Sequence, residues 1–244
     1  MNNELLLLSK NDIPFIEAQV NIHQPTISEI SLIGEENFFT ACQLINFNKN
    51  KLSDEDKLVL ADKTDFEIFM SIMSSKERVQ HRNSVLMLLA LVFPNYQIKM
   101  TQDEIILFSA DNSTRINNTN YDTFRNIIVK MFGLNESEGT CGGYNPADKR
   151  AEKIAEKLER ARAKRNKSID GQQKVAVFSR YISILSVGEN KDMNVLMQYT
   201  VFQLLDEFKR YQMKVAFDGY VSARLAGAKD LEEVDHWMND IHGN

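Results

Sequence analysis

The chain has 244 residues, of which 43% are hydrophobic and 26% charged, and its formal net charge is −5. These proportions exclude a fibre and a wholly disordered chain, and the few glycines and prolines favour helices over a turn-rich sandwich. The acidic balance argues against a protein whose entire surface binds nucleic acid. Cys42 and Cys141 are the only cysteines and give no disulfide framework, so we expect a reducing compartment.

The first 134 residues predict a domain that mixes helices with short strands. Residues 4–9 and 15–22 are short apolar or alternating runs of the kind that strands contain. Apolar residues at helical spacing then predict helices at 26–45, with Gly34 as a candidate bend, at 65–73 and at 76–93. A further helix is predicted from residue 53 onward, because acidic residues stand in its first turn. None of these apolar runs is long enough to span a membrane.

Capping boxes indicate where two of these helices begin. Thr26 is followed three residues later by Glu29, and Thr64 by Glu67, the spacing at which the two side chains satisfy the first free N–H groups of a helix. In the helix that follows Thr64, the apolar residues of one face are expected to point inward, and these are Phe66, Phe69, Met70 and Met73.

The hydrophobic period changes after residue 95. Residues 96–100 and 104–109 alternate between apolar and polar side chains and predict a β-hairpin. The polar, Asn-rich residues 111–120 predict a loop. A helix is then expected from Tyr121 to Phe132, with Gly133 as its stop.

A composition shift at residues 135–144, NESEGTCGGY, predicts a linker between domains 1–134 and 145–244. The second domain is expected to be all helical, with its helices in a basic segment from Pro146, at 175–187 up to Gly188, after Asp192, at 201–226 and at 231–241. Thr200 and Gln203 form a capping box at the start of the fourth of these helices, and Asp230 and Glu233 an analogous pair at the start of the last. The predicted fold class is therefore α+β and predominantly helical: an N-terminal α/β-mixed domain with a β-hairpin, followed by an all-α helical bundle.

The sequence contains no recognisable catalytic or metal-binding constellation. The glycine-rich residues 139–143 lack the Gly-Lys-Ser/Thr ending and the strand–loop–helix frame of a phosphate-binding loop, so a linker is the stronger interpretation. Residues of the types that bind metals lie near the C-terminus, His236 and Asp240 among them. Because no second histidine lies one helical turn away, a solvated acidic terminus is the better interpretation. We expect neither an enzyme nor a bound cofactor.

One local charge anomaly stands out. Residues 146–170 contain nine Lys or Arg and five Asp or Glu, a balance of +4. Contact with nucleic acid or an acidic protein is one interpretation. A solvated helix is favoured, because no aromatic side chain is interleaved to stack a base. If this helix binds a partner, the residues that we expect to carry the contact are Lys153, Lys157, Arg160, Lys164, Arg165, Ile154 and Leu158.

Several segments in order resemble a known family. They are FSRYISILSVG at 178–188, YTVFQLLDEFKRYQ at 199–212 and, most specifically, LAGAKDLEEVDHWM at 225–238. The series resembles tail assembly chaperones, or Gp15-like tail-morphogenesis proteins, of phages and prophages of Gram-positive bacteria. IGEENFF at 33–39 and NYDTFRNII at 120–128 resemble the same group more loosely.

The resemblance implies a non-enzymatic protein of the host cytoplasm that binds an unassembled tail protein, such as the tape measure or the tail tube. No catalytic or cofactor residues come with it, and no membrane association is expected. The alternative is a structural protein of the virion, a connector or tail-completion protein. A nucleic-acid-binding accessory protein that uses the basic helix is the less favoured third class.

Overall fold

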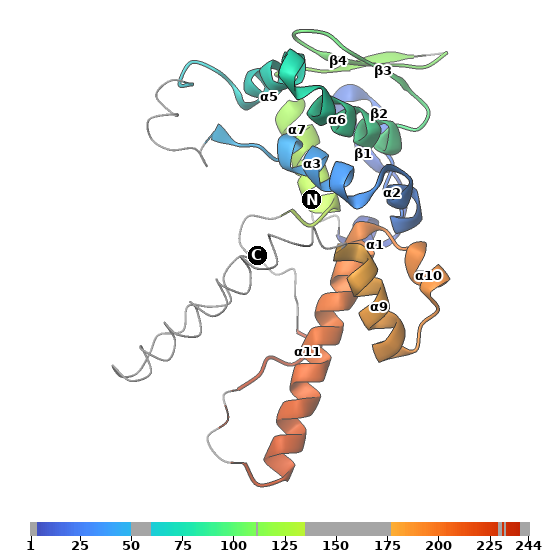
Figure 1. Cartoon of the computed structure of the whole chain (residues 1–244), viewed down its shortest axis with the longest axis vertical. Helices are drawn as coiled ribbons and strands as arrows, with labels where there is room; N and C mark the ends of the chain where they lie inside the picture. Colours follow the sequence, from blue (N-terminus) through green and yellow to red (C-terminus); the bar gives the residue numbers. More distant parts are fainter. Residues whose placement is uncertain are drawn as a thin grey trace. The chain divides into compact units, whose positions relative to one another are not determined.

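The computed structural model describes residues 4–49, 60–110, 112–134, 177–228, 231 and 233–239. The predicted class is confirmed, since the described elements are mostly helices with two small antiparallel sheets (Figure 1). The described residues before 135 and those after 177 share one hydrophobic core. The predicted linker at 135–144 and the basic helix after it lie outside the described residues, so they stay predictions.

The chain begins with helix α1 (Glu4–Leu8), not with the strand predicted for residues 4–9, and that prediction is wrong. Four consecutive leucines lack the alternation of a half-buried strand, and in α1 only Leu7 is buried. The helix packs against α11 (Val201–Leu225), whose Gln203 donates a hydrogen bond from Nε2 to the Leu8 carbonyl at 2.6 Å. A first hairpin follows, formed by β1 (Ile13–Phe15) and β2 (Val20–Ile22).

Two capping boxes are confirmed. Thr26 begins α2 (Ile27–Ile33) and Thr64 begins α5 (Asp65–Ser74), each with its predicted glutamate partner. Between them, α3 (Glu35–Ile45) packs extensively against α6 (Val79–Val92), a core helix that follows the short 3-10 turn η3 (Lys76–Arg78). The helix predicted from residue 53 lies in a segment that the structure does not describe.

The first capping box also carries a charge network. His23 contacts Asp12 through Nδ1 at 3.0 Å and Glu29 through Nε2 at 3.3 Å. Burial alone raises the pKa of the Glu29 carboxyl, but hydrogen bonds from the Thr26 backbone and hydroxyl and the neighbouring His23 outweigh it. The pKa of Glu29 is therefore lowered from 4.5.

The predicted hairpin is confirmed as β3 (Gln97–Met100) and β4 (Ile105–Phe108), which lie beside α6 (Figure 1). A third strand, β5 (Ser113–Ile116), occupies part of the segment predicted to be a loop, and that prediction is wrong. β5 is an edge strand in which Ser113 and Arg115 are exposed, Thr114 is half-buried and Ile116 is buried. One buried residue in four is too weak a signal to separate such an edge strand from a loop.

Helix α7 (Tyr121–Met131) ends as predicted at Gly133, which has φ +62°. The Leu134 N–H donates to the Val129 carbonyl at 2.8 Å, the long bond of a Schellman motif. Tyr121 lies in the core among aromatic rings, and its hydroxyl donates to the Ile45 carbonyl at 3.1 Å.

The C-terminal helices join this core. They are α9 (Val177–Glu189), α10 (Met193–Met197) and the long α11. On α9, Phe178 packs against Phe38 and Phe39 of α3, with ring centroids 5.5 and 5.2 Å apart. The Ile27 N–H donates to the Tyr199 carbonyl at 2.9 Å, just before the capping box at Thr200 that begins α11 as predicted.

Two predictions in this part are wrong. Gly188 does not end a helix, because it lies inside α9, where the ring of Tyr211 on α11 packs directly over it. The helix predicted for 231–241 is absent from residues 233–239, which are irregular. The ring of His236 packs on the ring of Phe217 on α11, with centroids 4.5 Å apart. Side-chain contacts to α11, and not helical hydrogen bonds, therefore position this segment.

Candidate binding groove

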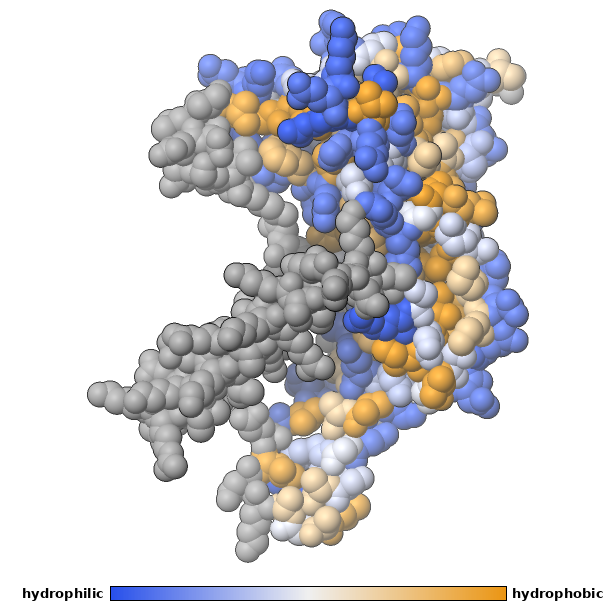
Figure 2. Space-filling model, viewed as in Figure 1, coloured by the Kyte–Doolittle hydropathy of each residue, from blue (hydrophilic) through white to orange (hydrophobic). Residues whose placement is uncertain are grey.

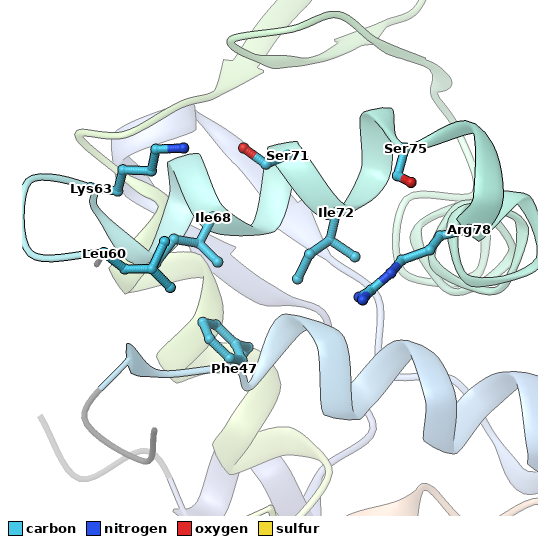
Figure 3. Close-up of a pocket in the computed structure, with 8 residues that line it drawn as sticks. All are labelled: Phe47, Leu60, Lys63, Ile68, Ser71, Ile72, Ser75 and Arg78. Carbon is cyan, nitrogen blue, oxygen red and sulfur yellow. The ribbon is translucent and has the colours of Figure 1, made fainter. Parts of the chain in front are cut away.

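An apolar groove of about 530 Å³ lies along α5 (Figure 3). One wall is the outer face of α5, and the other is formed by the chain just after α3 and just before α5. We call it the α5 groove, and its eight lining residues are Phe47, Leu60, Lys63, Ile68, Ser71, Ile72, Ser75 and Arg78.

The groove exists because α5 is apolar on two faces. The predicted core face is confirmed, since Phe66, Phe69, Met70 and Met73 are all 3% exposed or less. Ile68 and Ile72 are one helical turn apart on another side of α5 and line the groove (Figure 3). Ile68 is 6% exposed and Ile72 is half-buried. A helix that covered a core with one face only would carry polar side chains at these two positions.

A buried cation on α7 holds the two walls of the groove together. The Arg125 guanidinium donates to Asp65 Oδ2 at 2.6 Å and to the Phe47 carbonyl at 3.2 Å, while its side chain is only 13% exposed. The Lys49 N–H also donates to Asp65 Oδ1 at 3.0 Å. The groove walls are therefore fixed by charge-assisted hydrogen bonds, which are stronger than neutral ones.

The charged residues that line the groove are both cations. Lys63 precedes α5 and Arg78 follows it, so the two lie at opposite ends of the helix (Figure 3). Near Arg78 in the sequence, Lys76, His81 and Arg82 are also exposed, and the exposed acids beside the two lining cations are Asp62 and Glu77. The excess of charge is positive. Within the part of the chain that the structure describes, neither His81 nor any of the four Lys and Arg side chains forms an ion pair.

A second hollow, of about 450 Å³, lies between α1, the end of α9 and α11. Its charges are largely paired with one another: Lys191 bridges Glu189 and Glu207, and Arg210 pairs with Asp206 at 3.5 Å. Lys10 and Lys214 also line this hollow, but most of its charges are paired, so it offers a partner fewer free charges than apolar and paired groups.

A third feature is the C-terminal end of α11, where hydrophobic residues lie on the visible face (Figure 2). Val215, Val221 and Leu225 are 52%, 37% and 84% exposed. Leu225 and its neighbours lie in the segment that carries the most specific resemblance, but the described residues around them do not indicate a partner. The α5 groove is the better candidate, because it combines an apolar floor with unpaired charge.

The predicted partner-binding residues are not brought together by any described part of the structure. Lys153, Lys157, Arg160, Lys164, Arg165, Ile154 and Leu158 all lie within residues 135–176, outside the described ranges. The α5 groove was missed by sequence reasoning. The available signal was the pair Ile68 and Ile72, opposite the predicted core face of the same helix.

The described residues also bear on other kinds of site. These residues contain no group of three or more His, Cys, Asp or Glu that is placed to hold a metal ion. Across the same ranges, no helix is both long and apolar enough to cross a membrane. Cys42 is buried, and burial raises the pKa of its thiol far above the ordinary value.

The C-terminal part of the chain is similar to a known family. Residues 168–242 match the family described as the YomV second domain, which is of phage origin. The match covers under a third of the 244 residues and includes the described helices α9, α10 and α11. It supports a phage protein, as the resemblance implied. No curated protein and no solved structure shows significant similarity to the chain.

Proposed function

We propose that this phage protein is a non-enzymatic factor of tail morphogenesis, an assembly chaperone that works in the host cytoplasm. Its client is a helical tail protein, such as the tape measure, which it holds in the α5 groove until assembly. The observation that carries the proposal is an apolar groove with cationic ends on a chain whose C-terminal part matches a phage-derived domain.

The proposed client is a long amphipathic helix. A long amphipathic helix exposes an apolar stripe before its partners assemble, and that stripe drives aggregation unless another apolar surface covers it. Recognition of such a helix uses a hydrophobic groove that accepts side chains one turn apart. The floor of the α5 groove, built from Phe47, Leu60, Ile68 and Ile72, supplies such a surface.

The second candidate is a structural protein of the virion. Mass spectrometry of purified virions from the phage that encodes the chain separates the two. A chaperone leaves after assembly, so we expect this protein to be absent from mature particles or far below stoichiometric amounts. Its presence in one fixed copy number per tail would overturn the chaperone proposal and favour the connector or tail-completion role.

The third candidate, a nucleic-acid-binding accessory protein, rests on the basic helix alone. It predicts DNA binding that weakens steeply with salt, because each neutralised phosphate releases counterions. Replacing Lys157, Arg160, Lys164 and Arg165 by Gln abolishes that binding if the helix is the contact. We expect only weak binding at 150 mM salt, and little difference between the substituted and unsubstituted proteins.

A further inference from the structure

We propose that the α5 groove selects an amphipathic helix of about three to four turns that is acidic at both ends. This inference rests on the proposed function and adds the chemistry of the client segment. Its basis is the placement of Lys63 and Arg78 at the two ends of an otherwise apolar floor (Figure 3). An acidic side chain at each end of a docked helix then meets a cation while its apolar side chains cover the isoleucines.

The length of the occupant follows from the length of α5. Ten helical residues span about 15 Å at a rise of about 1.5 Å per residue. Lys63 and Arg78 lie just outside this span, so a helix that docks along α5 needs acidic residues roughly 11 to 14 positions apart to reach both. Its apolar residues recur three and four positions apart between those acids.

The sign of the charge distinguishes this occupant from others. The groove lining contains two cations and no acid. The exposed residues next to it add Lys76, His81 and Arg82 against Asp62 and Glu77, so the excess of charge stays positive. A basic helix placed here meets repulsion at both ends, and nucleic acid gains nothing from the four apolar side chains of the floor. The combined lining therefore fits an acidic, amphipathic protein segment.

The chemistry of the groove also predicts how binding responds to salt. Contacts between exposed charges are screened at high ionic strength, whereas burial of apolar surface is not. Raising salt from 50 to 500 mM is expected to weaken an acidic helix only partly, and to leave a neutral helix of the same apolar pattern unchanged.

The test uses the full-length protein and two fluorescent 16-residue peptides. Both carry the same apolar stripe, and one has glutamates and the other lysines near each end. Fluorescence anisotropy is expected to show the acidic peptide binding about tenfold more tightly than the basic one, since two exposed charge contacts together supply about 1.4 kcal/mol. The double variant Lys63→Glu/Arg78→Glu is expected to reverse the preference.

Control variants separate a local effect from a general one. Lys99→Glu reverses an exposed charge on β3, outside the groove, and should leave both affinities unchanged. Ile72→Ser removes an apolar contact from the floor and should weaken both peptides, whereas Leu32→Ser, at an 83% exposed site on α2, should weaken neither. Thermal unfolding of each variant confirms that it is folded.

Three results would overturn the inference. Equal affinity for the two peptides would show that charge does not select the occupant, and it would leave the proposed chaperone role standing. If Ile72→Ser weakened the binding of neither peptide, the binding site would lie outside the α5 groove. The chain has an acidic run of its own at Asp54, Glu55 and Asp56. Binding that appears only when this run is neutralised, in D54N/E55Q/D56N, would identify the run as the occupant. The chaperone role itself is tested separately, by mass spectrometry of purified virions, and it fails if the protein is present there in a fixed copy number.

Discussion

Replacing Gly188 by alanine tests the packing of α9 on α11. In a solvated helix this change stabilises by about 1 kcal/mol, so helix propensity alone predicts a gain. Here the added methyl group would lie 2.6 Å from Cε2 of Tyr211, and closer still to Cζ and the hydroxyl oxygen. The ring must move away from its contact. Because Gly188 is exposed and these atoms are the far end of a half-buried side chain, the cost lies near the low end of the about 1–3 kcal/mol of overpacking. Gly188 also lies in the last turn of α9, where the propensity gain is smaller than in a helix interior, so we expect a net loss of about 0.5 kcal/mol.

Urea unfolding followed by circular dichroism measures the change, and a second background supplies the control. In Tyr211→Ala the methyl group has free space, so Gly188→Ala should then stabilise by up to about 1 kcal/mol. A change of sign between the two backgrounds is the expected result. Stabilisation by Gly188→Ala in the presence of Tyr211 would refute the close contact between the two helices.

Three further predictions concern buried or paired side chains. Arg125→Met leaves the carboxylate of Asp65 without its charge partner and should cost about 3 kcal/mol in urea unfolding, with part of the loss recovered by adding Asp65→Asn. The lowered pKa of Glu29 means that its carboxylate contributes stability above pH 4.5, and that this contribution is lost as the pH falls further, so Glu29→Gln should flatten the acid limb of a stability–pH curve. Because burial raises the pKa of its thiol, Cys42 in a Cys141→Ser background should react with a thiol reagent at pH 8 only on unfolding.

Local signals predicted much of the fold. Thr64 and Glu67 mark the start of α5, and the hydrophobic spacing after them identifies its core face. The same local chemistry predicted the start of α11 at Thr200 and the end of α7 at Gly133. Each of these features depends on a few neighbouring residues, so the sequence contains all the information needed.

The remaining elements depend on partners distant in the sequence. β5 is a strand because Ile116 pairs with Ile105 and the Thr114 hydroxyl donates a hydrogen bond to the Ala18 carbonyl at 2.6 Å. Neither contact can be inferred from the sequence of β5 alone. Gly188 lies in the last turn of α9, which ends one residue later, and there it contacts Tyr211, 23 positions further along the chain. Tertiary contacts of this kind override local propensity.

The α5 groove was hidden for the same reason. Its two walls are separated in the sequence, and the contact that joins them runs through Arg125, 60 residues after Asp65. Local periodicity identifies Ile68 and Ile72 as a second apolar face but cannot show whether another element covers it. The basic helix, with its dense charge, was the more visible feature of the sequence.

Photo-crosslinking during phage production tests the binding groove most directly. Ser71 lines the groove with an exposed side chain, so a benzophenone amino acid in its place would lie beside any occupant. We predict crosslinks to an acidic, helical segment of a tail protein of the same phage, identified by mass spectrometry. The same probe at Leu32 on α2 should give none. Equal crosslinking of that segment at both positions, or no phage protein at Ser71, would contradict a client-binding groove along α5.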